Sequence, residues 1–299
     1  MKKILMVLGL TLFAILPFAN AAEIAPYGTL NYMIANNDNS SGEAVMEAKD
    51  NGSKLGVKIK EATPLGTAFG RIEVGVDTDD TGSSPFDSRL AFAGMDFGAL
   101  GKVSAGRQNS VFKNEVQSKT DMFPEYGARA TQKLFTRDSH TVVYSNNFGG
   151  LKFDNLVKID GSDGKNGIDV YETVVGFDVG RFDVGLGMSE NKVAEDSYYG
   201  IGFRAPITDA TSIAYSHTKK NPKSGADVKG NDYVLQHKIG PNKITLGYGK
   251  IEDSTAYTTL GAERKISDNG SMYIAYENQN KTSGSTDVDG MSFGFKFNF

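Results

Sequence analysis

"GMSFGFKFNF" (residues 290–299) carries a phenylalanine at every second position, namely Phe293, Phe295, Phe297 and Phe299. Small or polar residues stand between them. Because successive side chains of a strand point to opposite faces, this alternation predicts a β-strand with one aromatic face and one wet face. The stretch also contains Gly-x-Ser-x-Gly, but Ser292 lies inside the alternating run. A hydrolase needs that serine on a sharp strand-to-helix turn, so we expect no enzyme.

The same period of two recurs along most of the chain. "SKLGVKIKE" (53–61), for example, places aliphatic side chains on one face and lysines on the other. Glycine is abundant (35) and proline scarce (8), and no long amphipathic helix is apparent. The pattern predicts about sixteen strands, near residues 25–34, 53–61, 67–77, 87–97, 102–107, 138–146, 150–158, 168–178, 181–190, 197–205, 211–219, 230–239, 243–252, 255–266, 270–278 and 289–299.

The connections between these strands alternate in length. Short turns such as "TPLG" (63–66) and "GPN" (240–242) are followed by longer polar segments such as 36–52 and 219–230. In an up-and-down barrel with an even strand number, all short turns and both termini lie at one rim. Alternating strands with short turns at one side and long loops at the other are typical of transmembrane barrels in bacterial outer membranes. We expect an all-β, antiparallel transmembrane barrel, wide enough for an aqueous channel.

The first residues predict a secretory signal peptide. A short basic region is followed by an apolar run from Ile4 to Phe18 and by the small residues Ala19-Asn20-Ala21. We expect cleavage after residue 21, which leaves residues 22–299 as a single barrel domain. The chain has no cysteine, and its three histidines form no local cluster, so no cofactor or metal is expected. A net charge of −4 without a basic stripe argues against nucleic acid binding.

The segment from Gln108 to Thr136 is the longest connection. Long loops without regular structure are often functional. This one contains several apolar residues that water would not solvate well: Val111, Phe112, Met122, Phe123, Tyr126, Leu134 and Phe135. They predict that the loop packs against the barrel wall. Ala91 and Ala93 share the parity of Arg89, so an inward Arg89 would place a small-residue patch on the wall there.

Three stretches, "SRLAFAGMDFGALGKVSAGR" (88–107), "TDMFPEYG" (120–127) and "RDSHTVVYSNNFGGLKF" (137–153), together with Phe299, resemble the general, non-specific trimeric porins of Gram-negative outer membranes. The resemblance implies that the third loop folds into the lumen and narrows the pore, with its acids facing basic residues of the wall. Asp121 and Glu125 match the loop acids. Arg89, Arg137 and Lys54 match the wall bases. Where the family continues with glycine and an acid, this chain has Ala128 and Arg129, which adds a basic residue at the constriction.

The resemblance also implies a function, a location and partners. We expect passive diffusion of ions and small hydrophilic solutes through a homotrimer in the outer membrane, in contact with membrane lipids and lipopolysaccharide. The phenylalanines 293, 295, 297 and 299 would form the lipid face of the closing strand, paired with the first strand near "PYGTLNY" (26–32). The terminal Phe299 would serve as a signal for the barrel-assembly machinery. The alternatives are a solute-selective channel, an adhesin or structural barrel and, more remotely, an outer-membrane enzyme.

Overall fold

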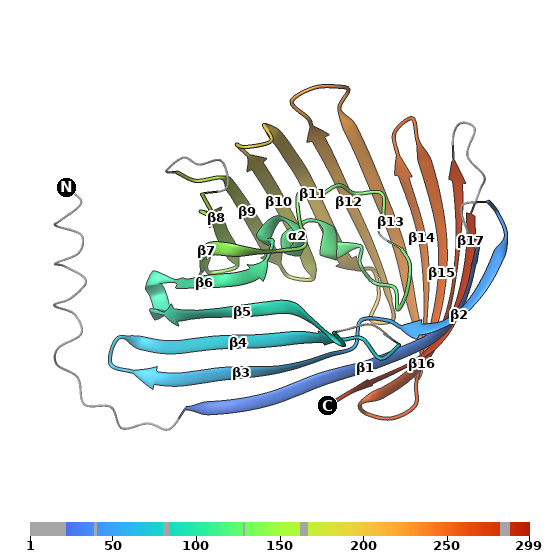
Figure 1. Ribbon diagram of the computed structural model, residues 1–299, viewed down its shortest axis with the longest axis horizontal. Coiled ribbons are helices and arrows are strands. Elements are labelled where there is room, and N and C mark those ends of the chain that lie inside the picture. Colours follow the sequence, from blue (N-terminus) through green and yellow to red (C-terminus); the bar gives the residue numbers. More distant parts are fainter. Residues whose placement is uncertain (1–21, 39–40, 80–83, 128, 162–166, 282–287) are drawn as a thin grey trace.

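The computed structural model describes residues 22–38, 41–79, 84–127, 129–161, 167–281 and 288–299, so the expected signal peptide lies outside the described residues. Antiparallel strands form almost all of it (Figure 1). The strands are β1 (Glu23–Asp38), β2 (Ala44–Asp50), β3 (Lys54–Thr63), β4 (Gly66–Val76), β5 (Phe86–Asp96), β6 (Lys102–Asn109), β7 (Arg137–Phe148), β8 (Leu151–Lys158), β9 (Val170–Val179), β10 (Phe182–Asn191), β11 (Asp196–Pro206), β12 (Thr211–Asn221), β13 (Val228–Ile239), β14 (Asn242–Ile251), β15 (Thr255–Lys265), β16 (Gly270–Lys281) and β17 (Val288–Asn298).

The sheet closes on itself. From β3 to β17 every strand pairs antiparallel with the next one in sequence. Strand β1 then joins the two ends, pairing with β17 from Thr29↔Asn298 to Asn37↔Gly290 and with β3 from Glu23↔Lys60 to Thr29↔Lys54. Closure leaves no edge strand, which a structure within a bilayer requires. The sixteen predicted strands and their pairing order are confirmed.

One strand segment was not expected from the sequence. Residues 44–50, placed in a loop by the sequence analysis, form β2 and pair with β1 from Tyr32↔Asp50 to Asp38↔Ala44. Strands β2 and β3 therefore lie end to end along the same side of β1, and together they occupy one of sixteen positions in the ring. A bulge joins them, in which residues 51–53 stand opposite Leu30 and Asn31. There the amide of Asn51 donates to the Asn31 carbonyl (2.8 Å).

Alternation separates the two faces of the wall. The three phenylalanines of β17 and Phe299, which directly follows it, are 40–54% exposed on the outer face, while Ser292 faces inward and is buried. The ring of Phe299 lies over Gly28 so closely that a Cβ at Gly28 would overlap it. The two residues also exchange backbone hydrogen bonds, Gly28 N to Phe299 O (2.8 Å) and Phe299 N to Gly28 O (3.1 Å). Glycine at this position therefore allows the aromatic ring to cover the junction of the first and last strands.

A β-bulge at Arg89 changes the parity of β5. Glu73 pairs with Leu90 and Val74 with Ser88, so Arg89 is the extra residue. After the bulge, Leu90 is buried on the inner face, while Ala91 pairs with the outward, exposed Ile72. The sequence-based inference that an inward Arg89 places Ala91 and Ala93 inward is thus wrong, because it assumed an unbroken period of two.

The two rims differ less than the sequence pattern suggests. Short connections such as 64–65, 149–150, 180–181 and 240–241 lie at one rim. At the other rim 77–85, 110–136 and 159–169 are long, but 192–195 and 252–254 contain only four and three residues. Residues 110–136 include the helix α2 (Val111–Glu115) and the 3-10 turn η2 (Gln117–Lys119). Among the described residues, no helix has the length and apolar composition needed to cross a membrane.

Candidate functional site

Residues 110–136 (the lumenal loop) run along the inner face of the wall instead of extending from the rim (Figure 1). The apolar side chains that the sequence singled out anchor its first half: Val111, Phe112 and Val116 form a buried cluster with Val143, Leu156, Val174 and Tyr198 of the wall, and Leu134 and Phe135 pack against it. The cluster lies on β7–β11, not on β5 as the alanine patch had suggested. The loop backbone approaches the wall where inward-facing glycines leave room for it, at Gly185, Gly202 and Gly230.

Three buried carboxylates of the wall bind the lumenal loop. Glu172 on β9 accepts hydrogen bonds from the Ser110 hydroxyl (2.9 Å) and the Phe112 amide (3.2 Å) at the start of α2. It also accepts a bond from the hydroxyl of Ser189 on the neighbouring strand (3.1 Å). Glu172 therefore fixes the point at which the loop leaves β6.

The other two carboxylates bind the second half of the loop. Asp232 on β13 accepts from the amides of Ala130 (3.2 Å) and Thr131 (2.9 Å), and Glu277 on β16 accepts from the Gly127 amide (3.0 Å). These side chains are 2% exposed or less. Backbone amides that would be left unsatisfied on the way across the lumen thus find acceptors on the wall. The loop is held at both ends and near its centre.

On the inner face of the wall, β4 and β5 present an ion-paired cluster. Glu73, 2% exposed, lies between two arginines, with Arg71 Nη2 2.6 Å and Arg89 Nε 2.8 Å from its carboxylate oxygens. The hydroxyl of Tyr27 donates to Glu73 (2.8 Å) and accepts from Arg71 Nε (2.6 Å). Sequence reasoning found Arg89 but missed its partner. The signal was present, because Arg71 and Glu73 share a parity with inward-facing positions of β4.

Two further predicted bases lie beside this cluster. Lys54 begins β3 and pairs with Gly75 on β4, and its charge interacts with those of Glu73, Arg89 and Arg71. Arg137 begins β7, and its charge interacts with those of Arg89 and Glu73. No ion pair binds Lys54 or Arg137 within the described part of the chain. The structure therefore brings together three of the four predicted bases, Lys54, Arg89 and Arg137, around Glu73.

The loop acids lie apart from that cluster. The Asp121 carboxylate is 53% exposed, and its nearest cation is Lys113 of the same loop, at 3.8 Å. Burial raises the pKa of Glu125, an effect that nearby Arg129 and Lys49 oppose. The main chain beside Glu125 is fixed by a bond from Asn51 Nδ2 to the Pro124 carbonyl (3.2 Å). Within the described residues neither acid forms an ion pair with a wall base. Asp121 lines a cavity of about 310 Å³ together with Arg204, Lys243 and Lys296 of the wall.

Arg129, the fourth predicted base, lies apart from the Glu73 cluster, beside β16. Its Nε lies 3.3 Å from the Glu277 carboxylate on β16, and its guanidinium lies 5.5 Å from the centre of the Tyr126 ring. Tyr126 in turn donates to Asn37 of β1 (2.6 Å). Arg129 is thus part of the attachment of the loop to the wall and does not join the Glu73 cluster.

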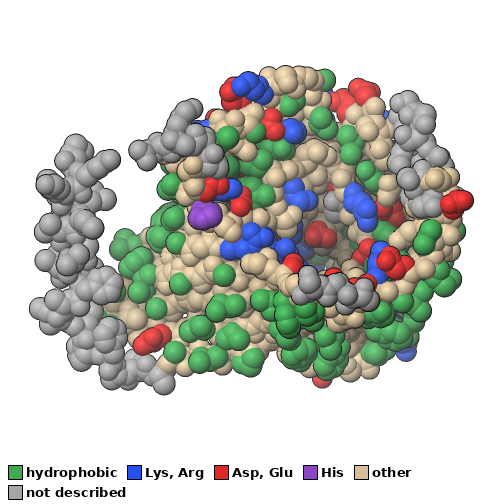
Figure 2. Space-filling view, viewed as in Figure 1, with side chains coloured by type: hydrophobic (Ala, Val, Ile, Leu, Met, Phe, Trp, Pro, Cys, Tyr) green, Lys and Arg blue, Asp and Glu red, His purple; other side chains and the backbone are tan. Residues whose placement is uncertain are grey.

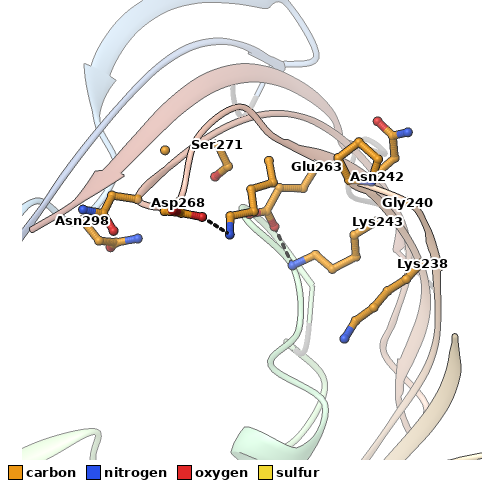
Figure 3. A pocket seen from close by; sticks show the side chains of 12 residues that line it. Lys238, Gly240, Asn242, Lys243, Glu263, Asp268, Ser271 and Asn298 are labelled. Carbon is orange, nitrogen blue, oxygen red and sulfur yellow. Dashed lines mark hydrogen bonds and ion pairs between the residues drawn. The ribbon is translucent and has the colours of Figure 1, made fainter. Parts of the chain in front are cut away.

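A further group of charged side chains lies near the short-turn rim, on β13–β16. Lys265 is paired with Asp268 (3.1 Å). Figure 3 shows Lys243 paired with Glu263 (2.5 Å), with Lys238 beside them and no partner drawn. They line a cavity of about 320 Å³. Figure 2 shows lysine, arginine, aspartate and glutamate side chains around the hollow in the middle of the molecule. The lumen is therefore lined with charges of both signs.

The sequence model described as "Gram-negative porin" matches residues 9–299. The chain belongs to the Gram-negative porin family. Outer membrane porin F of Xenorhabdus nematophila is 29% identical over 286 residues, 88% of this chain and 72% of that protein. Outer membrane porin N of Escherichia coli is 30% identical over 253 residues, 77% of this chain and 62% of that protein.

Solved porin structures share the fold of this porin. The anion-selective porin from Comamonas acidovorans superimposes with a TM-score of 0.76 at 18% identity, covering 93% of this chain and all of the other. Salmonella typhi OmpF, in complex with daunomycin, has a TM-score of 0.75 at 16% identity. The match covers 92% of this chain and 97% of the OmpF chain. Vibrio cholerae OmpT, in its trimer form, has a TM-score of 0.71 at 15% identity. The match covers 94% of this chain and all of the OmpT chain.

These relationships establish the general role of the molecule. It is a porin of the Gram-negative outer membrane, a closed barrel that forms a channel for passive diffusion of solutes. The lumen described above is that channel. The finer questions, which residues narrow it and which solutes it favours, depend on the charged groups and the docked loop.

Proposed function

We propose that the lumenal loop and the bases on β3–β7 together form the constriction of this porin. The observation that carries the proposal is the attachment of the loop by Glu172, Asp232 and Glu277, since it holds Asp121 and Glu125 inside the barrel. Lys54, Arg89 and Arg137 stand on the opposite wall. Charges separated by less than about 8 Å of salt solution are incompletely screened. A transverse field then favours small hydrated solutes and disfavours bulky apolar ones.

The charge balance of this constriction supports a weak preference for anions. On the wall, Lys54, Arg71, Arg89 and Arg137 face Glu73 and Asp87, which gives 4 − 2 = +2. The lumenal loop carries four basic and three acidic residues, but its Lys119 and Arg129 are paired with Asp183 and Glu277 of the wall. The positive charge of the constriction therefore comes from the bases on β3–β7. Rings of positive charge select for anions. The Comamonas porin of similar fold is described as anion-selective.

In this proposal the protein catalyses no reaction, and solutes pass unchanged down their gradients. We also propose that it is a homotrimer, because the Vibrio cholerae relative exists in a trimer form. Residues 1–21 are removed as a signal peptide, residues 22–299 form one barrel domain, and Phe299 is read by the barrel-assembly machinery. The outward phenylalanines 293, 295 and 297 contact membrane lipid, and lipopolysaccharide surrounds the outer rim.

Reversal potentials in a KCl gradient across a planar bilayer test the constriction. The wild type is expected to show a chloride permeability modestly above that of potassium. Replacing the loop acids by Asp121→Asn with Glu125→Gln preserves their shape and removes two negative charges, so the preference for chloride should rise. An unchanged reversal potential in the double variant would remove these residues from the constriction.

A further inference from the structure

Two aromatic side chains interrupt the charged lining of the lumen. Phe69 on β4 and Phe92 on β5 have inward parity, and their rings meet edge to face with centroids 6.4 Å apart. Each is only partly buried. The inward apolar side chains on β7–β11 are covered by the lumenal loop, but Phe69 and Phe92 do not belong to that buried cluster. An aromatic surface open to a water-filled channel is unusual and marks a candidate contact for apolar groups.

Cationic side chains border the aromatic corner formed by Phe69 and Phe92. Across the sheet Phe69 pairs with Lys60, and Phe92 pairs with Arg71, which pairs in turn with Lys58. Directly paired residues have Cβ atoms about 5 Å apart, so Lys60 stands beside Phe69 and Arg71 beside Phe92. Lys102 is paired with Asp96 (3.0 Å) and Arg71 with Glu73. Lys58 and Lys60 have no carboxylate partner in the described part of the chain. Lys58 Nζ lies 5.2 Å from the centre of the Tyr27 ring, and both ammonium groups keep hydrogen-bond donors for a ligand carboxylate.

The same residues enclose a cavity large enough for a small aromatic molecule. It measures about 450 Å³ and is lined by both phenylalanines, Lys58, Lys60 and Arg71. A second cavity of about 280 Å³ on the loop side shares Phe69, Arg71 and Phe92. Ligand sites typically measure about 300–1,000 Å³ and combine apolar walls with a few placed polar groups. The ring of Phe69 lies across Gly94, where a Cβ would overlap it, so it is held flat against the wall.

We propose that this aromatic–lysine corner binds aromatic carboxylates during their passage through the pore. The ligand ring packs against Phe69 and Phe92, and its carboxylate is bound by Lys58 and Lys60. An inorganic anion would use the lysines but gain nothing from the rings, and an uncharged aromatic would use the rings alone. This inference deepens the proposed function, on which it rests for transport, by naming a class of solute.

Single-channel recording with benzoate as the probe tests the proposal. In KCl at pH 7, benzoate on one side should cause brief interruptions or excess noise in the wild-type current, with saturation at high concentration. The double substitution Phe69→Leu with Phe92→Leu should raise the half-saturating concentration about 3- to 10-fold, because aromatic pairing is lost. Lys60→Gln should raise it about 2- to 5-fold. Acetate and benzyl alcohol should produce much weaker effects than benzoate.

The matched control is Phe153→Leu, which removes a ring of the same size from the outer face of β8. It should behave as the wild type does. If benzoate acts equally on the wild type, the double variant and Lys60→Gln while all of them conduct KCl, the proposal is overturned. Absence of KCl current in the wild type would instead contradict the proposed function. Titration calorimetry of benzoate into the detergent-solubilised protein then tests binding at the site independently of conduction. Loss of the binding heat in Lys60→Gln would support the proposal.

Discussion

At the scale of single residues, Glu73 has the largest influence on the net charge that the wall of the proposed constriction presents to the lumen. Among the residues that the structure describes it is the only carboxylate that bonds directly to Arg71 and Arg89, and it is almost completely buried beneath them. Its charge therefore cancels one of the two guanidinium charges at close range, and the remainder acts on the lumen. Neither arginine can lose its own charge at any relevant pH.

The variant Glu73→Gln should increase the preference for chloride, because it adds one net positive charge to the wall. At about 8 Å in water one charge is worth on the order of 0.5 kcal/mol, which corresponds to roughly a twofold change in permeability ratio. The loss of two charge-assisted bonds should also lower the free energy of unfolding in urea by about 1–3 kcal/mol. Glu263→Gln, which leaves Lys243 unpaired elsewhere, is the control. A reversal potential equal in both variants would contradict the role of Glu73.

Glu125 should make the ion preference depend on pH. Burial raises the pKa of this carboxyl, so it takes up a proton at a higher pH than an ordinary glutamate, whose pKa is about 4.3. As the pH falls from neutral through that raised value, the loop loses one negative charge and the preference for chloride rises. Reversal potentials measured between neutral and mildly acidic pH give the profile. In Glu125→Gln this part of the profile should be flat, and an identical profile in that variant would assign the proton to another group.

Sequence reasoning identified individual charges better than their partners. Arg89 and Asp121 were found because their local motif resembles a family pattern. The pairing of Arg89 with Glu73 depends on the register between β4 and β5, and that register contains a bulge that period-two counting does not reveal. The attachment of Arg129 to Glu277 joins residues that are 148 positions apart, and no local signal in the sequence indicates it.

At the scale of elements, the lumenal loop depends on acceptors supplied by other strands. Its backbone amides at residues 112, 127, 130 and 131 bond to three buried carboxylates, and its apolar side chains fill the space beside β7–β11. Its shape is therefore determined by the wall as much as by its own sequence. A change in one of these carboxylates should act on the width of the pore without altering the barrel.

Glu172→Leu should loosen the start of the loop, since Ser110 and the Phe112 amide lose their acceptor. A buried donor left without an acceptor costs about 1–3 kcal/mol. We expect greater open-channel noise and a changed mean conductance, while the barrel content measured by circular dichroism stays the same. Asp178→Asn, on the inner face of the same strand but bonded to Lys152 and not to the loop, is the matched control. Quiet, wild-type recordings from Glu172→Leu would show that this carboxylate does not hold the loop.

The loop illustrates what the sequence contains and what it omits. Its apolar residues indicated packing against the wall, since water solvates them poorly. Which wall they contact was predicted incorrectly, because the small residues that receive the loop are glycines on β10, β11 and β13, not the alanines of β5. Inward glycines on consecutive strands are a recognisable signal. It becomes readable only when the inward parity of each strand is known.

At the scale of the whole molecule, the fold was the most predictable property. Local alternation of apolar and polar residues predicts the individual strands. Closure of the barrel follows because an unpaired strand edge is too costly within a bilayer. Segment β2 escaped prediction because "AVMEAKD" (44–50) has exposed side chains on both faces and therefore does not alternate. It extends beyond the region where lipid and lumen impose opposite polarities. The alternation in sequence reflects the different surroundings of the two faces of a strand. Where both faces have the same surroundings, the alternation is absent.

The closing junction should respond to loss of its aromatic cover. Phe299→Ser removes the ring over Gly28, and burial of such a side chain contributes roughly 1.5–3 kcal/mol. We expect a smaller fraction of folded, heat-modifiable barrel in outer-membrane extracts analysed by gel electrophoresis without boiling. Phe148→Ser is the control, since Phe148 is equally exposed near the same rim but belongs to β7. An equal loss in both variants would indicate general membrane contact and not a particular role of Phe299.

The hydrogen bonds between Gly28 and Phe299 also bear on how the chain could be rewired. Since Phe299 ends beside Gly28, a linker of about six or more residues could run back along β1 to its start at Glu23. The chain could then be cut within 252–254 at the opposite rim. The resulting circular permutant would keep every strand pairing while its new ends lay on the other side of the membrane. Peptides fused there would be displayed at that surface. The order of the strands along the polypeptide and the architecture of the barrel would then be separate properties.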